Sequence, residues 1–136
     1  MMVSSKGRYA LRVMLDLAQH DNGEFMSLKE VAERQQISMK YLEMIVGLLN
    51  KGGMLLSIRG KKGGYRLAKK ASEYTVGSVL KLTENNLAPI NCPEMGEEGC
   101  NRADQCITLP MWKKLDDIID QYLKSVTLQD LLDGKV

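Results

Sequence analysis

Hydrophobic residues recur at helical spacing in three segments of the first half of the chain. The repeat is i, i+3, i+4 and i+7, which places its members on one face of an α-helix. The first face belongs to a predicted helix over residues 6–20, and two shorter helices follow, the last running to about residue 51. The faces consist of Ala10, Val13, Met14, Leu17 and Ala18; of Leu28, Val31 and Ala32; and of Leu42, Ile45, Val46 and Leu49.

The second and third helices carry their own start signals. Ser27 is a good N-cap, Glu30 completes a capping box three residues later, and Ser38 is placed to cap the third helix. The connection between them is Gln35-Gln36-Ile37, and two helices joined by so short a turn predict a helix-turn-helix. Such turns often contain glycine, so a left-handed Gln36 would cost roughly 1–2 kcal/mol relative to glycine.

A glycine-rich, basic segment follows the third helix. Arg59-Gly60-Lys61-Lys62-Gly63-Gly64 lies between two short runs of strand-forming residues, 55–58 and 65–67. Glycine tolerates the positive φ of a tight turn, and arginine and lysine neutralise phosphate. A basic hairpin directly after a helix-turn-helix predicts the wing of a winged-helix DNA-binding domain.

The second half of the chain predicts further helices around a long cysteine-bearing segment. Thr75 opens one helix, and residues 84–108 are rich in glycine, proline and acidic side chains and contain all three cysteines. From Pro110 a long helix carries one apolar stripe, and Thr127 with Asp130 forms a capping pair for a short terminal helix. The stripe consists of Met111, Leu115, Ile118, Ile119, Tyr122 and Val126. The predicted fold is mainly α with a small β-hairpin wing, a winged helix-turn-helix followed by a long C-terminal helix.

The composition agrees with a soluble globular protein. The chain has 136 residues, of which 44% are apolar and 26% charged, values that suit one folded domain with an additional helix or arm. No run of about 18 apolar residues is present, so we expect no membrane span. Lys6, Arg8 and Arg12 interrupt any signal-peptide core near the N-terminus, which predicts a cytosolic location.

Charge is distributed unevenly along the chain, although the net charge is only +2. Residues 1–70 contain 13 Lys and Arg against 6 Asp and Glu, whereas residues 71–136 contain 6 against 11. A basic first half attracts a polyanion, and an acidic second half is repelled by it. We therefore expect DNA at one end and a different partner at the other, with chance segregation of solvated charges as the alternative.

The predicted third helix is the candidate recognition helix, whose N-terminal and outward residues would meet base edges in the major groove. Lys40 suits phosphate or guanine, and Glu43 could accept from a cytosine amino group while penalising wrong sequences. Arg59 suits a narrow minor groove, whereas Lys61 and Lys62 suit phosphates. Each cation alone also fits a solvated surface. The predicted DNA-binding residues are Lys6, Arg8, Ser38, Lys40, Tyr41, Glu43, Met44, Arg59, Gly60, Lys61 and Lys62.

The three cysteines, Cys92, Cys100 and Cys106, are spaced C-x7-C-x5-C. An odd number argues against a disulfide framework, and the spacing lacks the C-x2-C pairs common in structural zinc sites. Thiolates on a chain that can wrap around a metal suit an iron–sulphur cluster. Redox-reactive thiols and a structural or zinc role are the alternatives that the spacing leaves open.

Motifs over nearly the whole chain form a recognisable set. They are Ser5-Lys6-Gly7-Arg8-Tyr9-Ala10-Leu11-Arg12, Ser27 to Gln35, Ile37-Ser38 with Tyr41-Leu42-Glu43, Arg59-Gly60 with Gly63-Gly64-Tyr65, Thr75-Val76-Gly77, the cysteine segment, Trp112 and Thr127-Leu128. In this combination they resemble the Rrf-two family of bacterial regulators. That family includes iron–sulphur cluster regulators, nitric-oxide sensors and a cluster-free regulator of cysteine metabolism.

The resemblance implies a homodimeric winged-helix transcription factor whose long penultimate helix pairs with that of its partner. Residues 1–83 would form the DNA-binding domain, 84–108 the sensor loop, and 109–136 the dimerisation helix and C-terminal cap. Double-stranded DNA sites would be two-fold symmetric, with half-sites about one helical turn apart. Dimer contacts would come from Trp112, Leu115, Ile118, Ile119 and Tyr122. A [2Fe-2S] or [4Fe-4S] cluster, whose assembly or damage changes DNA affinity, would bind to Cys92, Cys100 and Cys106.

Two features depart from the cluster-binding members that the chain resembles. The gap between Cys92 and Cys100 is longer than in the iron–sulphur cluster regulators of the family, and Leu109 stands where those regulators have a histidine three residues after the last cysteine. The nitric-oxide sensors of the family instead take an acidic ligand from the first helix, but in this chain that helix has no acidic residue before Asp16. The fourth ligand is therefore open among a further thiol, an external molecule, Glu94, Glu97, Glu98 and Asp104.

Two other functions compete with cluster sensing. The first is a cofactor-free regulator of the same fold, switched by thiol oxidation or by a partner protein. The second, an enzyme, is disfavoured because the single histidine, His20, is isolated and the chain shows no nucleophile motif and no paired acids near a phosphate-binding loop.

Overall fold

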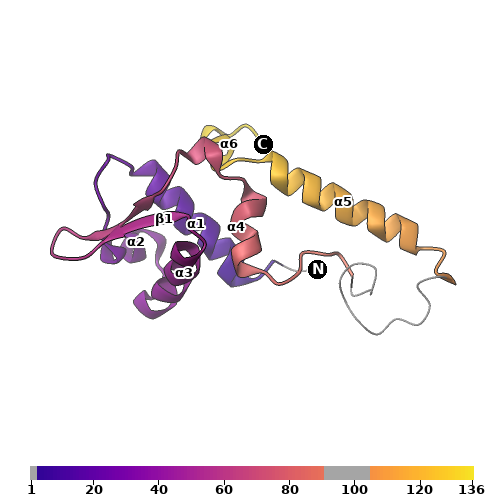
Figure 1. Ribbon diagram of the computed structural model, residues 1–136, viewed down its shortest axis with the longest axis horizontal. Coiled ribbons are helices and arrows are strands. Elements are labelled where there is room, and N and C mark those ends of the chain that lie inside the picture. Colours follow the sequence, from indigo (N-terminus) through magenta and orange to yellow (C-terminus); the bar gives the residue numbers. More distant parts are fainter. Residues whose placement is uncertain (1–2, 91–104) are drawn as a thin grey trace.

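Serine and threonine side chains cap the start of every α-helix in the described part of the chain except the helix that begins at Leu109. The computed structural model describes residues 3–90 and 105–136. In this part, Ser4, Ser27, Ser38, Thr75 and Thr127 each accept a hydrogen bond from a backbone amide in the following turn, which satisfies a donor that every helix start leaves open. The elements are α1 (Ser5–Gln19), α2 (Leu28–Gln35), α3 (Met39–Lys51), β1 (Leu55–Ile58), β2 (Gly64–Leu67), η1 (Ala71–Glu73), α4 (Val76–Thr83), α5 (Leu109–Ser125) and α6 (Leu128–Asp133) (Figure 1).

The helix-turn-helix prediction is confirmed, including its turn. Between α2 and α3, Gln36 has φ 55° and ψ 47°, and among the described residues it alone has a positive φ without being glycine. The left-handed backbone crowds its Cβ against the next carbonyl, so this turn stores strain that the packed helices on either side maintain.

The predicted wing is also present. β1 and β2 pair antiparallel, with Leu55 opposite Leu67 and Ile58 opposite Gly64. Met26, from the loop before α2, extends this sheet by exchanging backbone hydrogen bonds of 2.8 and 2.9 Å with Tyr65. Gly64 permits the approach, because a Cβ there would overlap the Met26 carbonyl. The hairpin is therefore fixed beside the start of α2.

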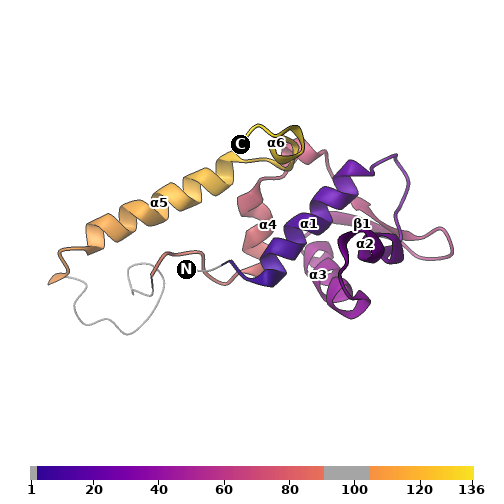
Figure 2. The same cartoon turned by 180° about the vertical axis from the view of Figure 1, so that it is seen from behind.

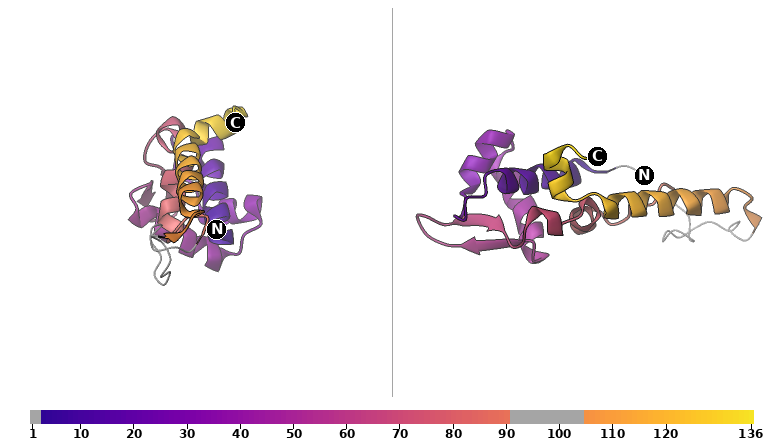
Figure 3. Two further views of the ribbon diagram at one scale, coloured as in Figure 1. Left: turned by 90° about the vertical axis from the view of Figure 1, so that its right-hand side faces the viewer. Right: turned by 90° about the horizontal axis from the view of Figure 1, so that it is seen from above.

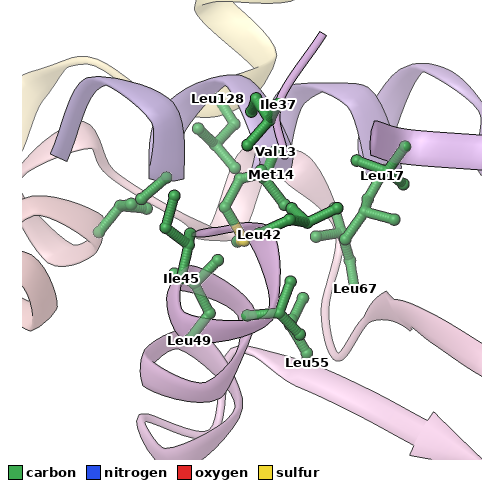
Figure 4. Close-up of a cluster of buried hydrophobic side chains, with 14 of the residues drawn as sticks. Val13, Met14, Leu17, Ile37, Leu42, Ile45, Leu49, Leu55, Leu67 and Leu128 are labelled. Atoms are coloured by element: carbon green, nitrogen blue, oxygen red, sulfur yellow. The ribbon is translucent and has the colours of Figure 1, made fainter. Parts of the chain in front are cut away.

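The main apolar core joins these elements around α1, and a smaller cluster of Val76, Leu80 and Val126 lies between α4 and the end of α5. α1 contacts α2, α3, α4, α6 and β2, and its central position is visible from behind in Figure 2. The predicted inward faces of the first three helices supply most of the buried residues. Figure 4 shows the centre of the main core, including Val13, Met14, Leu17, Ile37, Leu42, Ile45, Leu49, Leu55, Leu67 and Leu128.

α5 extends away from this core. Figure 1 and the view from above in Figure 3 show the hairpin and α5 at opposite ends of the molecule. The C-terminal end of α5 is held to the rest of the domain by two backbone hydrogen bonds. The Val76 amide donates to the Val126 carbonyl at 2.8 Å, and the Leu128 amide donates to the Tyr74 carbonyl at 3.0 Å. The predicted helix after Pro110 and the Thr127–Asp130 capping pair are confirmed.

Candidate nucleic-acid interface

The first turns of α3 present the predicted recognition residues to solvent. Lys40 and Glu43 are exposed, and Met44 keeps 41% of its surface exposed. The Ser38 hydroxyl accepts a hydrogen bond from the Tyr41 amide at 3.3 Å, and its own proton can still be donated to an outside acceptor. These groups can bind phosphates or read base edges in a major groove.

Tyr41, which the sequence placed among the DNA contacts, is half-buried and joins α3 to α1. Its ring lies edge-on to that of Tyr9, with centroids 5.6 Å apart, and its hydroxyl lies 3.4 Å from Ser5 Oγ. Lys6 and Arg8 stand on this same part of α1. The structure therefore brings the predicted contacts of α1 close to the first turn of α3.

The predicted contacts of the wing form its exposed tip. Arg59, Gly60, Lys61 and Lys62 are all exposed, and Gly60 has φ 115°, a conformation that glycine adopts without strain. Lys61 and Lys62 line a groove beside the start of α2, which Glu24 and Glu30 also line. These two carboxylates moderate the positive potential inside the groove, so attraction for phosphate is strongest at the tip.

Three arginines of the basic first half are committed to the fold. Arg12 hydrogen-bonds to Gln35 and lies over the Tyr9 ring at 4.9 Å. Arg66 donates to the Gly23 carbonyl at 2.7 Å. Arg34 pairs with Asp16.

Several other cations have no such role in residues 3–90 and 105–136, and four of them are predicted DNA contacts on α3 and the wing. Lys40, Arg59, Lys61 and Lys62 make neither an ion pair nor a hydrogen bond with another described side chain. All four belong to the recognition helix or the wing. Their charges are therefore available to a polyanion outside the chain.

Asp16 is a buried carboxylate that joins α1 to the helix-turn-helix. It accepts hydrogen bonds from Arg34 Nη2 at 2.7 Å, Arg34 Nε at 3.0 Å and Gln35 Nε2 at 2.8 Å. Burial raises its pKa, but these hydrogen bonds and the charge of Arg34 outweigh burial and hold the pKa below its ordinary value. The contact fixes the end of α2 just before the strained turn that leads into α3.

A second long-range contact, between Ser4 and Glu84, was not predicted. The Glu84 carboxylate accepts from the Ser4 amide at 2.7 Å and from the Ser4 hydroxyl at 2.8 and 3.0 Å. Gly7 makes room for it, since a Cβ there would lie 2.5 Å from Glu84 Oε1. The start of the cysteine-bearing segment is therefore attached to the first turn of α1, and the only sequence signal for this was a glycine inside a helix.

Cys106 is the one predicted cluster ligand that lies among the described residues. Its Sγ lies 3.2 Å from Thr108 Oγ1, and the hydroxyl and amide of Thr108 lower the pKa of the thiol. This favours the thiolate that a metal ligand requires. The described residues contain no group of three side chains able to hold a metal ion. The residues of this prediction that lie outside the described part are Cys92, Cys100, Glu94, Glu97, Glu98 and Asp104.

α5 carries apolar surface that the described part of its own chain leaves open. Four residues at helical spacing, Met111, Leu115, Ile118 and Tyr122, are 53, 37, 51 and 58% exposed. Trp112 and Ile119, which were also predicted to lie in the dimer seam, are half-buried. Ile119 lines the cleft between α5 and α4, and Trp112 lies seven residues earlier on the same side of α5. The apolar stripe is therefore Met111, Leu115, Ile118 and Tyr122.

Comparison with known proteins identifies the family. The model of the Rrf-two (Rrf2) family, described as an iron-dependent transcriptional regulator, matches residues 3–134. The chain belongs to the Rrf-two family. This confirms the winged-helix fold, the class of DNA-binding transcriptional regulators, and the expectation that the chain is not an enzyme.

Individual relatives agree with this assignment. The HTH-type transcriptional regulator IscR of Pectobacterium carotovorum subsp. carotovorum (strain PC1) is 40% identical over 135 residues, which cover 99% of this chain and 81% of the relative. Among solved structures, T. potens IscR has a TM-score of 0.78 and 34% identity, covering 100% of this chain and 89% of that one. CymR, the global cysteine regulator of B. subtilis, has a TM-score of 0.80 and 31% identity, covering 98% of each chain. Within the described residues, no helix combines the length and apolarity that crossing a membrane requires.

Proposed function

We propose that this Rrf-two protein is a cytoplasmic, homodimeric regulator that senses iron–sulphur, redox or nitrosative status through a cluster on its three-cysteine segment and responds by changing its affinity for DNA. One observation supports the assignment of the DNA-binding surface. The unpartnered cations Lys40, Arg59, Lys61 and Lys62 lie on α3 and the wing, the two elements that winged-helix proteins apply to DNA.

α3 would enter the major groove with Ser38, Lys40, Glu43 and Met44 toward the bases, and the wing would contact the neighbouring backbone and minor groove. Lys6 and Arg8 would add phosphate contacts beside the first turn of α3. Because two copies would present two recognition helices, the operator would be two-fold symmetric with half-sites about one turn apart.

The dimer would form through α5. The described part of the chain leaves its apolar stripe exposed at regular helical spacing, and a second α5 offers the same stripe for an isologous contact. Leu115, Ile118 and Tyr122 would lie at the centre of that contact. Ile119, which lines the cleft toward α4, and Trp112 would support it from the side.

The donor chemistry of Cys106 supports an iron–sulphur cluster on the cysteine segment. Cys106 has a thiol whose pKa is lowered by Thr108, and it stands directly before α5. Cys92, Cys100 and Cys106 would hold the cluster, which when bound would supply iron–thiolate chemistry sensitive to oxidants and nitric oxide. The likeness to IscR proteins supports this choice.

The contact of Ser4 with Glu84 offers a path from this segment to the DNA surface. Glu84 holds Ser4, the N-cap of α1, and the adjacent Ser5 reaches Tyr41 on α3. A rearrangement of residues 85–108 that pulled on Glu84 would displace the first turn of α1, and with it Lys6, Arg8 and the start of α3.

A cofactor-free regulator switched by thiol oxidation or a partner protein is the second candidate. Two observations favour it: the likeness to CymR extends over 98% of both chains, and Leu109 offers no ligand where the resembled cluster proteins have histidine. In this case Cys106, whose pKa is lowered by the hydrogen bonds of Thr108, would be the reactive residue.

Anaerobic purification distinguishes the two. Visible absorption, iron and sulphide per chain would be measured together with DNA binding for the parent protein and for Cys92→Ala, Cys100→Ala and Cys106→Ala. Iron–thiolate bands that disappear in the variants, with an altered DNA affinity, are the expected result. A colourless protein that cannot be reconstituted with iron and sulphide but still binds DNA would reject the cluster and leave the thiol or partner switch.

A further inference from the structure

Gly47 stands in the middle of α3 without an evident structural reason. Glycine in a helix interior is unfavourable relative to alanine, by roughly a fivefold factor in the folding equilibrium. Gly47 is exposed, and apart from its two chain neighbours and the backbone of its own helix no atom of the described residues lies within 4 Å of a Cβ built on it. Its φ is also in the ordinary helical region, so neither packing nor backbone conformation demands a glycine here.

The other described glycines do have such a reason. A Cβ would clash with or press closely against a neighbour at some of them, and the rest have a φ between +20° and +160°. Of the ten glycines in the described part of the chain, only Gly47 meets neither condition. The first group comprises Gly7, Gly52, Gly63, Gly64 and Gly77, and the second Gly23, Gly53, Gly60 and Gly134.

The helical position of Gly47 places it among the predicted base contacts. It follows Lys40 by seven residues, Glu43 by four and Met44 by three, so all four lie on one exposed face of α3. Along the helix axis it lies about 10 Å beyond Lys40. A recognition helix whose first turns reach the base edges would meet the wall of the groove at that distance.

We infer that Gly47 sets the depth at which α3 enters the major groove, by leaving room for the sugar–phosphate wall against the helix backbone. A B-DNA major groove is about 12 Å wide, and a helix with its side chains is about 10–12 Å across, so little space remains for a further side chain at the wall. A side chain at position 47 lifts α3 outward. Base readout by Lys40, Glu43 and Met44 is then lost, while the long lysines of the wing still reach phosphate.

This inference rests on the proposed DNA-binding function and makes position 47 a determinant of specificity. The test begins with a duplex enriched from a randomised pool by the parent protein and a shuffled duplex of equal composition. Binding of both is then compared at one salt concentration for the parent and for Gly47→Ala, Gly47→Ser and Gly47→Leu. Thermal unfolding of each variant is measured in parallel, and Gln19→Ala, an exposed helical position on α1, controls for helix stabilisation alone.

We expect Gly47→Ala to unfold at a higher temperature than the parent and yet to bind the enriched duplex about tenfold more weakly. The loss should reach about a hundredfold in Gly47→Leu, with the shuffled duplex changed by less than about threefold in both. Equal affinity of parent and Gly47→Leu for the enriched duplex would overturn the inference while leaving DNA binding intact. A parent protein that enriches no sequence would instead overturn the proposed function itself.

Discussion

α1 and α5 have the same kind of amphipathic pattern but different surroundings. In α1, Ala10, Val13, Met14 and Leu17 are at most 3% exposed, because four other helices and a strand close around them. In α5, the stripe of Met111, Leu115, Ile118 and Tyr122 is 37% exposed or more. Periodicity therefore identifies an apolar face in both helices, whereas only the fold shows that the described part of the chain buries the first face and leaves the second exposed.

The two regions also differ in how they use charge. Around α1, some cations are committed to internal contacts, as Arg34 is to Asp16, and others are exposed, among them those of α3 and the wing. On α5, the ion pair of Asp120 with Lys124 is solvent-exposed on both sides. We interpret the first region, the core around α1 with α3 and the wing, as a platform that presents charge. We interpret the second, α5, as an arm that presents apolar surface.

The largest expected effect comes from breaking the arm's apolar stripe with Ile118→Lys. A cation in the α5 contact would be buried among apolar side chains without a charged partner, so the protein should become monomeric by light scattering and its affinity for a two-fold symmetric duplex should fall about a hundredfold. Asp117→Asn makes the same change in net charge about 100° away round the helix and should remain dimeric. A dimeric Ile118→Lys protein would show that the stripe is not the seam.

Neutralising one buried and one exposed carboxylate tests whether the two regions use charge differently. Asp16→Asn should lower the free energy of unfolding by about 2–3 kcal/mol, because it leaves the hydrogen-bonding groups of Arg34 and Gln35 without a charged partner. Asp120→Asn should produce no measurable change, since exposed ion pairs contribute little. Urea denaturation measures both, and a similar loss in the two variants would contradict the distinction.

The Asp16 effect should also depend on pH. The folded-state pKa of this carboxyl lies below its ordinary value of about 3.9, so its stabilisation is fully present above that value and is lost as the pH falls through the folded pKa. The difference in stability between the parent and Asp16→Asn should therefore shrink below about pH 4.

A smaller effect is expected from the wing. The double variant Lys61→Ala/Lys62→Ala should weaken binding to specific and shuffled duplexes alike, by about tenfold at low salt, and reduce the slope of log affinity against log salt by about 2. Lys124→Ala, on the arm, should leave the slope unchanged. Equal slopes for all three proteins would mean that the wing tip does not contact phosphate.

The smallest effect concerns the strained turn of the platform. Gln36→Gly should raise the free energy of unfolding by about 0.5–1 kcal/mol, because glycine adopts the left-handed conformation without crowding its Cβ. Gln35→Gly should lower it, since Gln35 is helical and hydrogen-bonds to Asp16. Thermal and urea unfolding would measure both, and a destabilised Gln36→Gly would show that the side chain of Gln36 matters more than its backbone strain.

Local signals were sufficient for much of the fold and part of the site. Capping by Ser27, Ser38 and Thr127, the left-handed turn at Gln36 and the wing all depend on residues within a few positions of one another, and the structure has each of them. The same locality explains why Lys40 and the wing tip could be proposed as DNA contacts from spacing alone. The attachment of Ser4 to Glu84 and the pairing of Met26 with Tyr65 could not be predicted in this way, because their partners are far apart along the chain.

The sequence by itself determined where the helices begin, which faces are apolar and where basic residues concentrate, because these depend on side-chain chemistry and near-neighbour spacing. The tertiary structure decided which apolar faces close into a core, which arginines are used internally and which glycine has no structural need to be small. Those outcomes depend on which segments meet in space, and burial and hydrogen bonding between distant residues are properties of the folded chain alone.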